Sequence, residues 1–288
     1  MTTQLPAPSN DLGDQVILVT GATDGLGRAV AHELAARGAT LLLHGRSDAR
    51  GAQVLAEIRA ASGNERLTWY RADFADLAEV RDLAEQITAE QPRLTVLLNN
   101  AGLGVDPVRH ASVDGHELTF QVDYLSPYML SYLLAPLLDR SAPARIVTVT
   151  SAGQAPIDFG DVMLTGSFDG VQAYCQAKLA EIMLTFDLAE QLPAEHVTVN
   201  CLHPASMMPT KIVTHMFTPM SQVADGVRSV IRAATDPTLA GVTGRYFNQQ
   251  HEARAHEQAY DLTARATLRH LAAHLTGVSA TVPAATSG

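Results

Sequence analysis

Short apolar runs alternate along the chain with longer segments in which apolar residues recur every three or four positions. Runs that are apolar throughout predict strands buried on both faces, and the longer periodicity predicts amphipathic helices. The apolar runs are Gln15–Thr20, Thr40–Gly45, Leu67–Asp73, Leu94–Asn100, Arg145–Ser151 and Val197–His203, with a seventh candidate at Gly244–Asn248. The helical segments are Gly27–Gly38, Ala49–Ser62, Asp76–Gln91, Asp114–Leu138, Ala173–Phe186 and Val223–Ala234.

Strands separated by helices predict a parallel sheet, because each parallel connection needs a crossover that covers one face. We therefore predict an α/β fold: a single-domain, Rossmann-type, doubly wound parallel sheet of about seven strands. A C-terminal helical segment follows at Glu252–Leu275. No linker interrupts the pattern, so the predicted domain spans residues 14–276. Small residues and prolines predict flexible tails at residues 1–13 and 277–288.

The composition is that of an acidic globular protein. Charged residues make up 17% of the chain and the formal net charge is −10, with no Lys/Arg cluster, so nucleic acid is not a predicted partner. The longest apolar stretch, Tyr128–Leu138, is shorter than the ~18 residues of a membrane span. Residues 1–14 lack the basic and apolar regions of a secretory signal. The two cysteines, Cys175 and Cys201, are too few for a disulfide framework and favour a cytoplasmic location.

Histidines are candidate metal ligands where they lie close together in the sequence. Two pairs lie close in sequence, His251 with His256 and His270 with His274. Neither has a third ligand at a spacing typical of zinc, so no metal site is predicted.

A glycine-rich turn follows the first predicted strand in "TGATDGLGRAV". Glycines let backbone N–H groups approach a pyrophosphate at a helix N-terminus, where the helix dipole favours anions. A plain turn is the alternative, but the position between strand and helix favours a dinucleotide site. The candidate contacts in this turn are Gly21, Gly25, Leu26 and Gly27.

The end of the second strand bears on which dinucleotide is bound. An acidic residue there would hold the ribose hydroxyls of NAD, but "LLLHGRS" has Gly45 followed by Arg46. A guanidinium suits a 2′-phosphate, although a solvated loop arginine is the alternative. Asp24 in the glycine turn opposes extra phosphate, and its other role is to cap the first helix. NADP(H) is favoured and NAD(H) stays open.

Five motifs occur in the order found in the short-chain dehydrogenase/reductase family, which the chain resembles from about Gln15 to Asn248. Tyr-x3-Lys alone carries little weight, whereas the ordered set is specific. The insertion between the serine and the tyrosine, together with the C-terminal segment, resembles the retinol-dehydrogenase-like branch. The motifs are "TGATDGLG" (Thr20–Gly27), "NNAG" (Asn99–Gly102), Ser151, "YCQAK" (Tyr174–Lys178) and Pro204.

The resemblance implies a catalytic set that the chemistry can explain. Tyr174 would give or take the proton on the substrate oxygen, and Ser151 would polarise that oxygen. A tyrosine has a pKa near ~10, and the ammonium of Lys178 on the same helix face would lower it. A surface Tyr/Lys pair and a strand-end serine are the structural alternatives. The fourth member in the family is an asparagine, but here Asp123 stands in its place and adds charge near Lys178.

Further residues are assigned to cofactor binding by the resemblance alone. Asn100 and Gly102 would support the central strand and contact the adenosine side. Asp73 would contact the adenine, with a helix cap as its alternative. The remaining implied cofactor contacts are Tyr174, Lys178, Pro204 and Met207.

The resemblance implies that the segment after the sixth strand, Ala205–Met220, covers the substrate. Its thioethers and Phe217 suit an adaptable apolar lid, with core packing as the alternative, and Ala155–Leu164 would face it. We predict an NADPH-dependent reductase of an apolar ketone or aldehyde; Lys211 is the nearest candidate anchor for a charged substrate. A dinucleotide-sensing binding protein or an epimerase or dehydratase of the same family stays open, as does a homo-oligomer. The lid residues are Met207, Met208, Met216, Phe217 and Met220.

Overall fold

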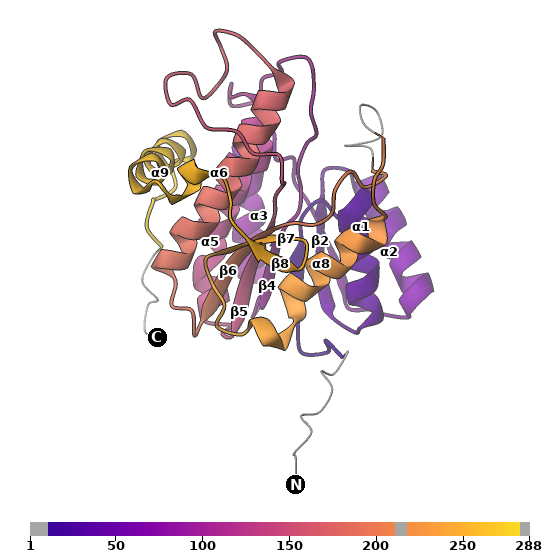
Figure 1. Ribbon diagram of the computed structural model, residues 1–288. Coiled ribbons are helices and arrows are strands. Elements are labelled where there is room, and N and C mark those ends of the chain that lie inside the picture. Colours follow the sequence, from indigo (N-terminus) through magenta and orange to yellow (C-terminus); the bar gives the residue numbers. More distant parts are fainter. Residues whose placement is uncertain (1–10, 211–217, 283–288) are drawn as a thin grey trace.

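The described residues form one α/β layer structure around a twisted sheet (Figure 1). The computed structural model describes residues 11–210 and 218–282. Their eight strands lie in the order β3-β2-β1-β4-β5-β6-β7-β8. All neighbours are parallel except β7 and β8, which pair antiparallel. The strands are β1 (Val16–Val19), β2 (Thr40–Gly45), β3 (Leu67–Arg71), β4 (Val96–Asn99), β5 (Ala144–Val149), β6 (Val197–His203), β7 (Arg245–Asn248) and β8 (His251–Ala253).

Helices cover both faces of the sheet, as the uniformly apolar strands predict. Successive residues of β1 alternate between two cores: Leu18 packs in one, and Ile17 and Val19 pack in the other. The first core lies under α3, α5 and α6, and the second under α1, α2 and α8 (Figure 1). The helices are α1 (Gly25–Ala36), α2 (Asp48–Ser62), α3 (Leu77–Glu90), α4 (Leu118–Phe120), α5 (Ser126–Asp139), α6 (Gly170–Gln191), α8 (Val223–Thr235) and α9 (Leu262–Thr276).

The long helix predicted over Asp114–Leu138 is interrupted. Glu117 caps α4 through its carboxylate, and a π-helical turn, η1 (Gln121–Leu125), joins α4 to α5. This turn carries Asp123, which is fully buried. A π turn adds one residue within a continuous apolar stretch, so the hydrophobic periodicity gives little sign of it.

The C-terminal segment packs against α5 and α6. It consists of the 3-10 turn η3 (Glu257–Tyr260) and α9, and Arg265 of α9 pairs with Asp187 of α6 at 2.6 Å. The packing continues past the predicted domain end, because Val278 is buried and its carbonyl accepts a hydrogen bond from Tyr128. The part of the predicted tail that is described, residues 277–282, is therefore not loose.

At the other end, Leu12 is 9% exposed and its N–H donates to the Arg37 carbonyl, so the ordered chain begins before residue 14. Across the described residues, we find no helix with both the length and the apolar character needed to cross a bilayer.

Candidate active site

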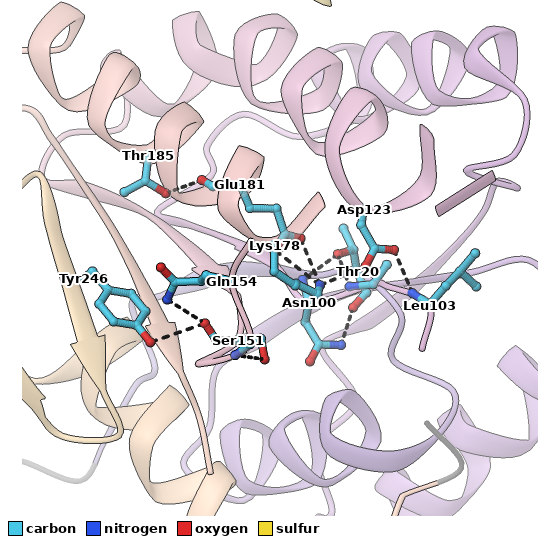
Figure 2. A network of polar contacts seen from close by, with 12 residues as sticks. Thr20, Asn100, Leu103, Asp123, Ser151, Gln154, Lys178, Glu181, Thr185 and Tyr246 are labelled. Atoms are coloured by element: carbon cyan, nitrogen blue, oxygen red, sulfur yellow. Dashed lines mark hydrogen bonds and ion pairs between the residues drawn. The ribbon is translucent and has the colours of Figure 1, made fainter. Parts of the chain in front are cut away.

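The glycine turn joins β1 to α1 at the carboxyl edge of the sheet. A Cβ at Gly27 would lie 2.3 Å from Nδ2 of Asn100 and 2.4 Å from the Gly21 carbonyl oxygen, so no side chain fits there. Asn100 follows β4, and its Nδ2 donates to the Thr20 carbonyl at 2.8 Å (Figure 2). The close approach packs the start of α1 against the sheet edge. A helix start at this edge could hold a pyrophosphate by its backbone N–H groups.

The start of α1 itself is set by Asp24, whose carboxylate accepts the Gly25 N–H at 2.8 Å. The predicted capping role of Asp24 is thereby confirmed. The side chain of Leu26 is 8% exposed and packs in the core beside α8. Any cofactor contact of Leu26 would therefore use its backbone.

His44, near the end of β2, anchors the glycine turn and was not singled out in the sequence. Its Nδ1 accepts the Gly21 N–H at 3.3 Å, and its Nε2 lies 3.1 Å from the Ala72 carbonyl. Because a carbonyl only accepts, Nε2 carries the proton and the ring is neutral. Burial lowers the pKa of His44 to about 4, and the ring stacks on Phe74 at 4.4 Å between centroids.

This histidine should make stability depend on pH. The unfolded chain takes up a proton at His44 below its ordinary pKa of 6.5, whereas the folded protein resists protonation down to about pH 4. Stability is therefore present above pH 6.5 and lost as the pH falls toward 4, by about 3 kcal/mol. The free energy of unfolding of His44→Gln, measured with urea, should fall between pH 7 and 4 by that amount less than the free energy of the wild-type protein. Parallel curves for the two proteins would contradict the assignment.

Two predicted cofactor contacts lie at the ends of β2 and β3. Arg46 is exposed, and no residue in the described ranges forms an ion pair with it. Asp73 is half-buried, and its Oδ1 accepts the Ala75 N–H at 3.1 Å. The cap of α3 is Asp76, so the helix-cap alternative for Asp73 is wrong.

The predicted catalytic residues come together from two elements. Ser151 follows β5, and Tyr174 and Lys178 lie one turn apart in α6. The Ser151 Oγ and the edge of the Tyr174 ring lie close together, since a Cβ on Gly153 would be 3.4 Å from the first and 3.9 Å from the second. The Ser151 hydroxyl lowers the pKa of the phenol. The Lys178 Nζ lies 5.6 Å from the centre of the Tyr174 ring. The surface-pair alternative is excluded for Lys178, whose side chain is 7% exposed.

Ser151 is held in place by its own loop and by β7. Its Oγ accepts the Gly153 N–H at 3.0 Å. Its carbonyl accepts hydrogen bonds from Gln154 at 3.0 Å and from the Tyr246 hydroxyl at 3.3 Å (Figure 2). The hydroxyl therefore sits on a braced turn next to α6.

Two carboxyl side chains lie beside the Lys178 ammonium. The Asp123 Oδ2 lies 2.9 Å from its Nζ, and Oδ1 of the same carboxylate accepts the Leu103 N–H at 2.7 Å (Figure 2). Glu181, one turn along α6, lies 3.2 Å from Nζ and is also buried. Glu181 was missed in the sequence, where its spacing of three residues from Lys178 was the available signal.

The charges in this cluster set the protonation of the phenol. Burial raises the pKa of Tyr174. The nearby Lys178 and Ser151 lower this pKa, whereas Asp123 and Glu181 raise it, and the net shift is upward. Burial lowers the pKa of Lys178, but the two carboxylates and the phenol outweigh it, and the ammonium stays charged. Tyr174 is thus a protonated acid at neutral pH.

Gly102 lies against the ion pair of Lys178 and Asp123. A Cβ on this residue would come within 3.2 Å of Lys178 Nζ and 3.3 Å of Asp123 Oδ2. A side chain at this position would press on the ion pair, which explains the glycine.

The segment after β6 is described only in part. Pro204 is buried directly after the strand, and Met207 is half-buried with a left-handed φ of 48°. Met208 is buried against Leu26 and Gly226, so for this residue core packing is the correct alternative. Met220 is 77% exposed. Lys211, Met216 and Phe217 lie outside the described residues.

The predicted apolar wall at Ala155–Leu164 is largely packed into the protein. Ile157 and Val162 belong to the core under α6, and the Ile157 N–H donates to Gln258 at 2.7 Å. A cavity of about 330 Å³ lies beside the Ser151 loop instead. Its lining includes Gln154, Tyr246 and His256. In the described parts of the chain, no group of three or more His, Cys, Asp or Glu side chains is arranged to hold a metal ion.

Comparisons with known proteins agree with this geometry. A family model described as short chain dehydrogenase matches residues 15–221. Retinol dehydrogenase 14 of Homo sapiens is 33% identical over 276 residues, which cover 86% of this chain and 82% of that protein. A crystal structure of an uncharacterized protein from Mycobacterium paratuberculosis has a TM-score of 0.78 at 25% identity, covering 95% of this chain and 97% of the other.

A second solved structure bears on the site. It is a short chain dehydrogenase from Escherichia coli CFT073 in complex with NADPH, with a TM-score of 0.69 and 29% identity. The match covers 84% of this chain and 100% of that one. Family model, relatives and fold agree, and the chain is an oxidoreductase that belongs to the short-chain dehydrogenase/reductase family, in its retinol-dehydrogenase-like branch.

Proposed function

We propose that this protein is an NADPH-dependent reductase of an apolar ketone or aldehyde, with Tyr174 as the proton donor. The proposal is carried by one observation: the Ser151 hydroxyl and the Lys178 ammonium both lie close to the Tyr174 ring, one beside its edge and the other 5.6 Å from its centre. This cluster follows β5 and the start of α6, at the sheet edge that also carries the glycine turn after β1. The proposed proton donor, the hydroxyl that would orient the substrate and the glycine turn that would bind the dinucleotide therefore lie at the same edge of the sheet.

Each residue has a role that its surroundings support. When bound, the nicotinamide would supply the hydride. Ser151 would hold the substrate oxygen by a hydrogen bond, and Tyr174 would donate its proton to that oxygen. Lys178, held charged by Asp123 and Glu181, would steady the phenolate that remains. Its ammonium would also bind the nicotinamide ribose.

The cradle fits a dinucleotide. The close packing of Asn100 and Gly21 against Gly27 holds the start of α1 at the sheet edge, where its backbone N–H groups could bind a pyrophosphate. Asp73, Asn100, Gly102, Pro204 and Met207 are proposed as further contacts. NADPH is favoured over NADH by the exposed Arg46 after β2 and by the NADPH found in the related Escherichia coli enzyme.

Reversing the charge at Arg46 should change cofactor preference. A guanidinium on a 2′-phosphate contributes about 1.5–3 kcal/mol, so Arg46→Asp should lower the kcat/KM ratio of NADPH to NADH roughly 10- to 100-fold. Arg50→Asp makes the same charge change on an exposed residue in the first turn of α2 and serves as the control. An unchanged ratio in Arg46→Asp, or an equal change in both variants, would count against Arg46 as the phosphate reader.

An apolar substrate is supported by the relatives and by the loop after β6. Retinol dehydrogenase 14 is named for an apolar alcohol. The half-buried Met207 follows β6 at the carboxyl edge of the sheet, where a flexible thioether could cover a substrate.

NADPH consumption tests the function. The purified protein should oxidise NADPH in the presence of apolar ketones or aldehydes from a panel graded by length, and show little turnover with small charged carbonyls. NADPH binding without consumption across the whole panel would contradict the reductase and favour the dinucleotide-sensing alternative.

A further inference from the structure

Two buried carboxyl groups share one ammonium at the catalytic centre. Lys178 Nζ lies 2.9 Å from Asp123 and 3.2 Å from Glu181. The side chains of Lys178, Asp123 and Glu181 are 7%, 0% and 2% exposed. Figure 2 shows both carboxyl groups approaching the amine from different elements, the turn η1 and helix α6.

Other groups do little to offset a second negative charge. The Asp123 Oδ1 accepts the Leu103 N–H, but the hydroxyl of Thr185 donates to the backbone carbonyl of Glu181 and not to its carboxylate. The other titratable groups facing the pair are the Tyr174 phenol and the Cys201 thiol. Within residues 11–210 and 218–282, Lys178 is the cation that acts on both carboxyls.

Charge counting then limits the protonation state. With both carboxyls ionised, the cluster would carry one uncompensated negative charge away from water, which is strongly unfavourable. Like charges around one site also oppose joint ionisation. Burial raises the pKa of both Asp123 and Glu181, in the direction that retains a proton.

We propose that Asp123 and Glu181 hold one proton between them at neutral pH, so that the cluster around Lys178 is electrically neutral. Glu181 is thus a positioning residue that acts on Tyr174 through Lys178. A neutral cluster does not draw the proton off the phenol, and Tyr174 stays an acid ready to reduce a carbonyl. The effect on Tyr174 as a proton donor rests on the proposed function. The presence of the shared proton does not depend on that function.

Infrared spectroscopy can detect the proton without turnover. Wild-type protein at neutral pH should show the C=O stretch of a buried protonated carboxyl, sensitive to exchange into D₂O. Asp123→Asn and Glu181→Gln should each lose this band, because one carboxylate then pairs with Lys178 and the extra proton leaves. Glu190→Gln, on the same helix but 61% exposed, should keep the band. A wild-type spectrum without the band would overturn the proposal, even if a variant failed to fold.

The pH profile of alcohol oxidation tests the consequence. Oxidation needs the Tyr174 phenolate, so its rate rises with pH as the phenol ionises; this rising part of the pH profile is its alkaline limb. Each single variant keeps a neutral cluster, and its limb should lie at the same pH as the wild-type limb. The double variant Asp123→Asn/Glu181→Gln leaves Lys178 uncompensated, and its limb should move to lower pH by about one unit or more.

The outcomes separate two kinds of failure. A limb that moves in each single variant would mean that both carboxyls are ionised, and a double variant that does not move would mean that they do not act on Tyr174. Either result overturns the proposal. Absence of turnover in all proteins, with the infrared band present, would refute the proposed function and leave the shared proton standing.

Discussion

Tyr174→Phe is expected to lower NADPH-dependent carbonyl reduction by roughly 10²–10⁴-fold. The substitution removes the hydroxyl that donates the proton and keeps the ring, which packs near Lys178 at 5.6 Å. NADPH binding should therefore be nearly unchanged. Steady-state kcat and a fluorescence titration of NADPH binding measure the two quantities separately.

A matched control tests whether the loss is specific. Tyr70 lies on the edge strand β3, far along the sheet from Ser151, and its hydroxyl donates to Glu90 at the end of α3. Tyr70→Phe removes this hydroxyl. This variant should keep its activity. Full activity in Tyr174→Phe would refute the assigned role, and a joint loss of activity and NADPH binding would point to a damaged site instead.

Arg265→Ala is expected to destabilise the protein by about 3 kcal/mol. The Arg265 side chain is 5% exposed and pairs with Asp187 through Nε at 2.8 Å and Nη2 at 2.6 Å. Its removal leaves a buried carboxylate with Arg269, at 3.0 Å, as the remaining partner. Because this pair fixes α9 to α6, the helix that carries Tyr174 and Lys178 loses its outer support.

Urea unfolding of Arg265→Ala and Arg228→Ala compares a buried pair with an exposed one. Arg228 pairs with Asp225 on α8 and is 62% exposed, so its loss should cost about 1 kcal/mol or less. Equal losses in the two variants would show that the α9 contact contributes no more than a surface ion pair.

The main strands and helices were predictable because burial on both faces leaves an apolar signature. β6 lies at Val197–His203, as predicted, since all of its residues are buried. β8 was missed because its three residues, His251–Ala253, are polar or small and pair antiparallel at the edge of the sheet. The π turn at Gln121–Leu125 was missed because every residue around it is apolar or buried, which hides a shift of one position.

The site was predictable where the chemistry fixes residue type and spacing, and less so where it depends on packing. Tyr174 and Lys178 are four residues apart on one helix, and Ser151 ends a strand next to it. Their meeting follows from the order of motifs. His44 carries no such signal, because its role depends on contacts made across the fold with Gly21 and Ala72. Glu181 had only its spacing of three residues from Lys178 as a signal, and its role depends also on Asp123 from another element.

Transfer of deuterium from NADPH labelled at C4 of the nicotinamide tests the central claim most directly. With an apolar ketone from the panel, the wild-type protein should place deuterium on the carbinol carbon of the product, from one face of the nicotinamide only, and Tyr174→Phe should form almost none of this product. NADPH that binds but yields no labelled alcohol, or a Tyr174→Phe protein that labels the product at the wild-type rate, would contradict it.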